Sequence, residues 1–89
     1  MTHQLDKTVL EDALAVSLAR AMARANRRAL EEGFSVADCL VSVAESIENG
    51  ASFWRISYGP RNPVRRRGGE LVVDVGTDDA EVRRVLRGQ

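Results

Sequence analysis

The side chains best suited to chemistry in this sequence are arginines gathered in one segment. Arg61 is followed by a run of three more, Arg65, Arg66 and Arg67. A guanidinium group donates paired hydrogen bonds to carboxylates and phosphates, so the segment could recognise an acidic protein surface or a nucleic acid. The alternative is a solvated loop whose charges keep neighbouring molecules apart. All three interpretations fit the residues.

Phe53 and Arg55 form a second candidate site. Side chains alternate between the two faces of a strand, so both are expected on the face that meets water. An exposed aromatic ring beside a guanidinium is typical of an interface hot spot. We therefore expect Phe53, Arg55 and the arginine segment to contact a partner protein.

The sequence does not predict a catalytic or metal-binding constellation. His3, the only histidine, lies in an N-terminal segment expected to fray, and Cys39 is the only cysteine. A metal site would have to use carboxylates alone. The acidic residues Asp78, Asp79 and Glu81 are better explained as part of a solvated turn than as metal ligands. Cys39 fits a buried small side chain better than a reactive thiol. We expect a binding protein rather than an enzyme, with no cofactor and no metal ion.

The composition predicts a single domain with no general attraction to polyanions. The 89 residues include 13 basic and 13 acidic side chains, so the formal net charge is zero. This balance makes nucleic acid an unlikely partner, and we expect no membrane partner. A single cysteine suits the reducing cytoplasm, and no run approaches the roughly 18 apolar residues that span a bilayer.

A long helix is predicted over residues 8–32, after a flexible tail at 1–7. Thr8 and Glu11 have the spacing of a capping box, and apolar residues then recur every three or four positions. Gly33 is a typical stop signal. Such a helix would be about 37 Å long, more than one small sheet covers.

The surplus length of this helix suggests a second interpretation of the protein, as a structural homodimer. Ala13, Ala21 and Ala25 are small enough to let two helices approach closely. In that interpretation the helix of each copy packs on its mate.

Asn49 and Gly50 predict a hairpin, because a type I′ turn needs positive φ at both central positions. Folding the chain about this turn pairs Glu45 with Trp54, Val43 with Ile56, and Val41 with Tyr58. One face then collects the apolar side chains Val41, Val43, Ile47, Trp54, Ile56 and Tyr58.

Two segments fit more than one secondary structure. Residues 35–49 suit a strand, but their apolar positions also fit a second helix. A long loop over 59–69 and a third strand from Glu70 to Val75 follow. Residues 81–87 suit either a fourth strand or two turns of helix.

A family resemblance favours the strand in the first of these segments. Its motif is a tryptophan strand over 54–60, a variable loop, a double glycine opening the strand over 68–75, and the ending 85–89. In these features the chain resembles small PepSY-like and nuclear-transport-factor-like (cystatin-like) bacterial domains, including immunity proteins of polymorphic toxin systems. The resemblance implies a helix followed by an antiparallel sheet.

Together these observations predict an α+β fold in which a long N-terminal helix packs on a three- to four-stranded antiparallel sheet formed by residues 39–89. The resemblance implies a protein-binding module of the immunity type, which neutralises a toxin by occlusion. The alternatives are the homodimer module and nucleic-acid binding through Arg61–Arg67.

Overall fold

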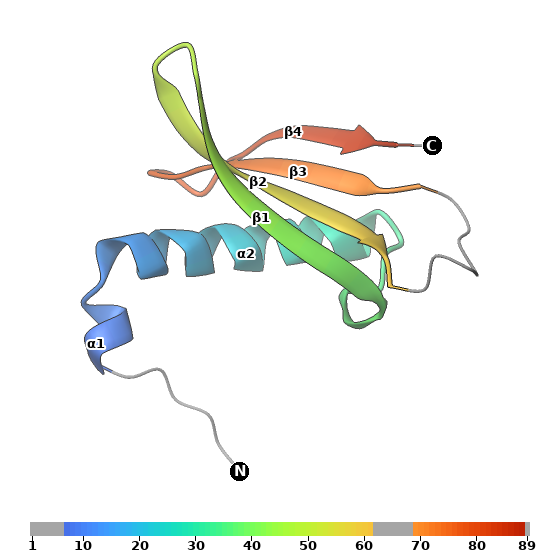
Figure 1. Cartoon of the computed structure of the whole chain (residues 1–89), viewed down its shortest axis with the longest axis horizontal. Helices are drawn as coiled ribbons and strands as arrows, with labels where there is room; N and C mark the ends of the chain where they lie inside the picture. Colours follow the sequence, from blue (N-terminus) through green and yellow to red (C-terminus); the bar gives the residue numbers. More distant parts are fainter. Residues whose placement is uncertain (1–6, 62–68, 89) are drawn as a thin grey trace.

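One helix packs on one antiparallel sheet in the computed structural model, which describes residues 7–61 and 69–88 (Figure 1). In chain order the elements are α1 (Lys7–Leu10), α2 (Ala13–Glu31), the 3₁₀ turn η1 (Val36–Asp38), β1 (Cys39–Glu48), β2 (Ala51–Pro60), β3 (Leu71–Gly76) and β4 (Val82–Arg87). The predicted α+β class is confirmed, with four strands in the order β1-β2-β3-β4. Among the described residues, no helix is long and apolar enough to cross a membrane.

The predicted helix over 8–32 is interrupted at Asp12. This residue has extended backbone angles, φ −90° and ψ 109°, and its Oδ1 accepts a hydrogen bond of 3.0 Å from the N–H of Ala15. A side chain that caps the following turn in this way starts a new helix. As a result α2 has 19 residues and is about 28 Å long.

The helix ends at Gly33, as predicted. Gly33 has φ 90°, and the N–H of Phe34 donates to the carbonyl oxygen of Ala29 at 2.9 Å. A glycine in the left-handed region with this bond is the Schellman ending, in which the chain reverses without strain.

The hairpin about Asn49 and Gly50 is confirmed. Their φ values of 54° and 79° match a type I′ turn. The register is also as predicted, with Glu45 opposite Trp54, Val43 opposite Ile56 and Val41 opposite Tyr58. The helical alternative for residues 35–49 is therefore wrong.

The strand order gives a meander in which β1 and β4 are the two edges. β4 is a strand, so the helical alternative for residues 81–87 is wrong as well. The pairing of β3 with β4 contains an irregularity between Asp74 and Val75, where the register shifts.

The core lies between α2 and the central strands. Ala21, Ala25 and Ala29 are fully buried and let the helix axis approach the sheet, where Trp54, Ile56, Tyr58, Leu71, Val73 and Val75 meet them. Ala21 and Ala25 are therefore not exposed, and the predicted contact between two helices through them is wrong.

Hydrogen bonds join α2 to β2 and to the turn after β3. Trp54 Nε1 donates to Ser17 Oγ at 2.9 Å, and Ser17 Oγ donates to the carbonyl oxygen of Thr77 at 2.7 Å. Near the other end of β2, Tyr58 OH donates to Asn26 Oδ1 at 2.7 Å. Burial, with a smaller contribution from Cys39, raises the pKa of Tyr58 to about 12.

The substitution Ser17→Ala tests the link between helix, sheet and turn. It leaves the buried Trp54 N–H without a partner, so we expect a loss of about 1–3 kcal/mol in the free energy of unfolding. Urea titration followed by tryptophan fluorescence measures it. Ser42→Ala, on an exposed part of β1, is the control and should change little. Equal stability of the two variants would contradict the role given to Ser17.

Candidate protein-docking surface

Among the described residues, no helix lies over the sheet face opposite α2, which we call the outer face (Figure 1). Its side chains come from alternate positions of all four strands and include Leu40, Ser42, Ala44, Ser46, Arg55, Ser57, Val72, Asp74, Arg84 and Leu86. Leu40 and Leu86 are exposed large apolar residues on it. An open sheet face of this kind, with apolar and charged side chains, is a surface on which another protein can pack.

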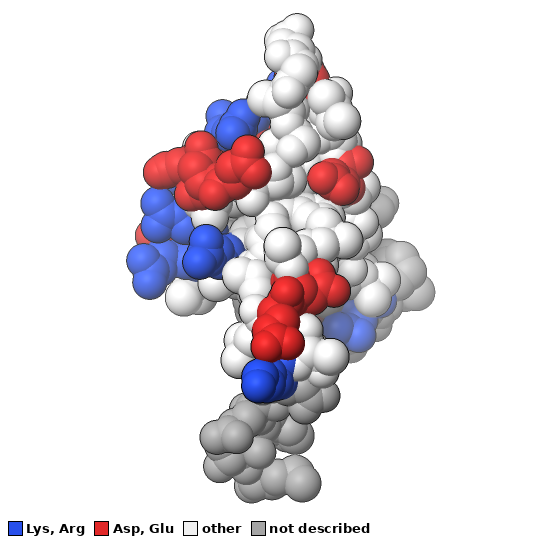
Figure 2. Space-filling model, turned by 90° about the vertical axis from the view of Figure 1, so that its left-hand side faces the viewer, with Lys and Arg blue, Asp and Glu red and all other residues white. Residues whose placement is uncertain are grey.

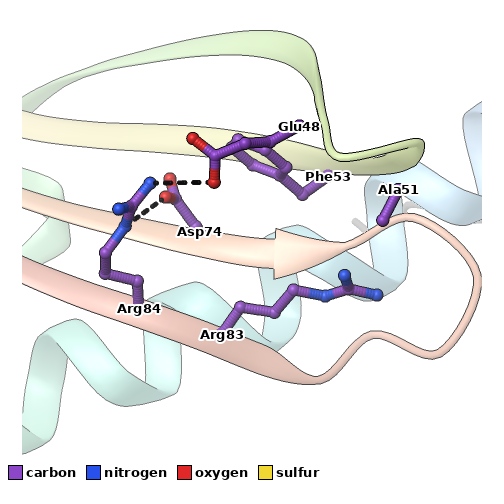
Figure 3. Close-up of a pocket in the computed structure, with 6 residues that line it drawn as sticks. All are labelled: Glu48, Ala51, Phe53, Asp74, Arg83 and Arg84. Atoms are coloured by element: carbon purple, nitrogen blue, oxygen red, sulfur yellow. Dashed lines mark hydrogen bonds and ion pairs between the residues drawn. The ribbon is translucent and has the colours of Figure 1, made fainter.

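A buried carboxylate organises the charges of the outer face. Arg55 donates from Nε and Nη2 to the two oxygens of Asp74, both at 2.9 Å. Arg84 Nε donates to Asp74 Oδ2 at 3.2 Å (Figure 3). The sheet register produces this arrangement, because Arg55 and Arg84 are the cross-strand neighbours of Asp74 on either side.

The two arginines keep the buried carboxyl group of Asp74 ionised at neutral pH. Asp74 is only 2% exposed, and burial alone would raise the pKa of its carboxyl group. The hydrogen bonds from Arg55 and Arg84 outweigh that effect and hold the pKa below its usual value. In turn the hydrogen bond to Asp74 raises the pKa of Arg55.

Phe53 lies on the outer face but is buried, so the prediction that its aromatic ring is exposed is wrong. It retains 6% of its accessible surface. Its cross-strand neighbour Gly76 has no side chain to hold it away from the sheet. The Arg55 guanidinium lies 5.5 Å from the ring centroid and covers it, an arrangement with cation–π attraction.

A hollow lies beside this cluster at the end of the sheet near the β1–β2 turn. Its walls are Glu48, Ala51, Phe53, Asp74, Arg83 and Arg84 (Figure 3). Arg84 Nη2 is 3.8 Å from Glu48 Oε1, and Arg83 Nη2 is 3.5 Å from Asp79 Oδ2. Exposed ion pairs of this length contribute little to stability, so these arginines can exchange their present carboxylates for those of a partner.

The predicted site residues do not all come together. Arg55 and Phe53 lie on the outer face, whereas Arg61 follows the far end of β2, about 20 Å from Arg55 and about 26 Å from Phe53 along the strand. There Arg61 Nη2 donates to the carbonyl oxygen of Cys39 at 3.0 Å. Arg65, Arg66 and Arg67 lie outside the described residues, so their role in binding protein or nucleic acid stays a prediction.

Sequence reasoning missed Asp74, Arg83, Arg84 and Glu48. The usable signal was the acidic residue at 74, which stands on the outer face between two inward-facing valines. An acidic side chain there needs a positive cross-strand neighbour if it is to be buried. Finding Arg55 as that neighbour requires the β2–β3 register, which no short turn specifies.

Basic and acidic side chains lie together around the β3–β4 turn. Arg20, Arg24 and Arg27 of α2 line a shallow hollow together with Asp79 and Glu81. Figure 2 shows acidic and basic side chains next to one another on the side of the molecule that carries this turn. Within the described ranges, no group of three or more His, Cys, Asp or Glu side chains is placed to hold a metal ion.

No protein-family model, curated protein or solved structure matches the chain. The resemblance to PepSY-like and cystatin-like domains therefore stays a prediction from the sequence motif.

The substitution Asp74→Asn should lower stability at neutral pH by roughly 1–3 kcal/mol, because two guanidinium groups lose a charged acceptor. The pKa of Asp74 is lowered by folding. The carboxylate therefore stabilises the fold above the pKa of the unfolded chain, about 3.9, and this contribution disappears as the pH falls through the folded value.

Chemical unfolding of Asp74→Asn and wild-type protein at several pH values between about 7 and 2.5 measures this effect. The two stabilities should converge at the acidic end. Asp78→Asn, in the exposed turn, is the matched control. A stability difference between Asp74→Asn and wild type that did not shrink on acidification would contradict the ion-pair explanation.

Proposed function

We propose that this protein is a non-catalytic protein-binding module that covers and occludes a partner with the outer face of its sheet. One observation carries the proposal. A buried carboxylate, Asp74, holds the guanidinium groups of Arg55 and Arg84 on a sheet face that no helix of the described residues covers. Exposed apolar side chains, Leu40 and Leu86, lie on the same face.

The arrangement of Arg55 favours binding. Two of its donor groups are engaged by Asp74, which limits the rotation of the side chain before any partner arrives. A side chain that is already ordered loses less conformational freedom on association. Arginines held in this way, with remaining N–H groups free, are common among the residues that dominate binding energy.

The chemistry of the face indicates the chemistry of its partner. The free guanidinium N–H groups of Arg55, Arg83 and Arg84 match carboxylates, and Leu86 with Val72 offers apolar contact. The partner would therefore carry acidic side chains beside an apolar patch. The resemblance to immunity-type proteins suggests a toxin in this place, neutralised because its working surface is covered.

The test uses the double variant Ser57→Glu with Leu86→Glu, which adds negative charge on β2 and β4 of the outer face. Affinity capture from the native cells, compared with wild type, should identify a partner that the double variant loses. Leu30→Glu, an equally drastic change at an exposed position of α2, is the control and should capture normally.

The captured partner is then purified and titrated by calorimetry. Loss of hot-spot contacts should weaken binding of the double variant by at least about tenfold, the equivalent of 1.4 kcal/mol. A partner that bound the double variant as tightly as wild type would show that the outer face is not the docking surface.

A further inference from the structure

We infer that the free edge of β1 pairs antiparallel with β1 of a second copy of this chain, joining two four-stranded sheets into one continuous sheet. This inference uses the edge of the sheet and not its outer face, so it is independent of the function proposed above.

The backbone of β1 presents a long unpaired edge. In a two-residue type I′ hairpin the flanking residues, here Glu48 and Ala51, exchange both backbone hydrogen bonds. Bonded and non-bonded pairs alternate, so even-numbered residues of β1 face β2 and odd-numbered residues point away from it. Apart from the ladder with β2, no backbone hydrogen bond among the described residues reaches 41–47. About 24 Å of edge is therefore open.

The start of this edge is closed by a side chain. Cys39 is an odd-numbered residue of β1, and its outward carbonyl oxygen accepts the hydrogen bond from Arg61 Nη2 at 3.0 Å. This bond agrees with the alternation and limits the open run to the residues after Cys39. The guanidinium of Arg61 is thereby held at one end of the free edge.

The two edges of the sheet differ in their protection. Natural edge strands are usually blunted by charged residues, most often lysine, by proline or by a bulge, because an open ladder recruits other strands. β4 has such protection in Arg83, Arg84 and Arg87 and in the register shift opposite it. β1 has ten residues in regular register with no lysine, arginine or proline, and its only charges are Glu45 and Glu48.

The apolar side chains of β1 also lack cover. Val41, Val43 and Ile47 are on the helix side of the sheet, yet they are 37%, 39% and 74% exposed. Their cross-strand neighbours Tyr58 and Ile56 are fully buried. α2 therefore covers the central strands and stops short of the edge, leaving an apolar strip along it.

The strand is complementary to itself when the twofold axis passes through Ala44. In an antiparallel pair, the residue numbers of two facing residues always add up to the same total. With the axis at Ala44, Val41 therefore faces Ile47 of the second copy, Ser42 faces Ser46, and Val43 faces Glu45. This pairing joins outward-pointing backbone groups on both strands and places the smallest side chain at the axis. The two Glu45 positions lie diagonally, about 7–8 Å apart, where water screens them.

The ends of the strand add charge complementarity. Antiparallel pairing sets the Cys39 end of one β1 beside the Glu48 end of the other. Arg61, held at Cys39 by its hydrogen bond, then lies next to the exposed carboxylate of Glu48 from the second copy. An unrelated extended peptide would not supply these matched ends, which is why a second copy is the favoured occupant.

The experiment combines molar-mass measurement with a charge swap at the axis. Sedimentation velocity of the full chain from about 1 to about 500 μM covers the range expected for a small interface. Wild type should form a dimer within that range. Ala44→Lys and Ala44→Glu each place like charges directly opposite at the axis, so each alone should remain monomeric. An equal mixture of the two should regain the dimer.

The controls separate dimerisation from folding. Ala44 is exposed, so circular dichroism should show both variants folded like wild type. Leu86→Lys adds the same charge on the same face at the other edge and should leave the dimer intact. Wild type that stays monomeric at the highest concentration would overturn the inference. The inference would also be overturned if Ala44→Lys still formed dimers, or if the mixture of charge variants stayed monomeric.

Discussion

A single helix packs on a four-stranded sheet, and the width of that helix limits how much of the sheet it can bury. An α-helix with its side chains is about 10–12 Å wide, whereas four strands spaced about 4.8 Å apart need more cover than that. α2 lies over the central strands through its buried alanines, and Trp54 and Tyr58 hydrogen-bond to it from β2. No helix among the described residues covers the opposite face of the sheet, and the apolar side chains along the β1 edge stay exposed.

The open face is ordered by electrostatics more than by apolar packing. Asp74 is the one buried charged residue in the described part of the chain, and two arginines compensate it. Replacing such a cluster with apolar residues is often neutral or stabilising in other proteins, so stability alone does not explain its presence. Fixed guanidinium groups are, however, well suited to recognition, which connects the cluster to the proposed docking role.

The two proposed surfaces are compatible with each other. Pairing through β1 would use the strand edge and the apolar strip on the helix side, while the outer face stays free. It would also place two outer faces side by side in one continuous sheet. A partner with two matching sites, or two partners held together, would then bind with higher effective affinity than one copy alone provides.

Local chemistry alone determined several parts of this protein. Asn49 and Gly50 specify the hairpin turn because few other residue pairs tolerate positive φ twice in succession, and the turn sets the β1–β2 register. Gly33 ends the helix for a similar backbone reason. These features depend on residues close together in the chain, so the sequence contains their full explanation.

Contacts between distant segments decided the rest. The Arg55–Asp74 pair requires the β2–β3 register, and no short turn joins these strands, so no local rule sets it. Burial of Phe53 depends on a glycine in another strand, and exposure of Val41 and Val43 depends on where α2 lies. Sequence alternation assigned each side chain to a face of the sheet. Only the packing of helix on sheet decided which of those side chains would be covered, because cover is a property of the neighbouring element and not of the strand itself.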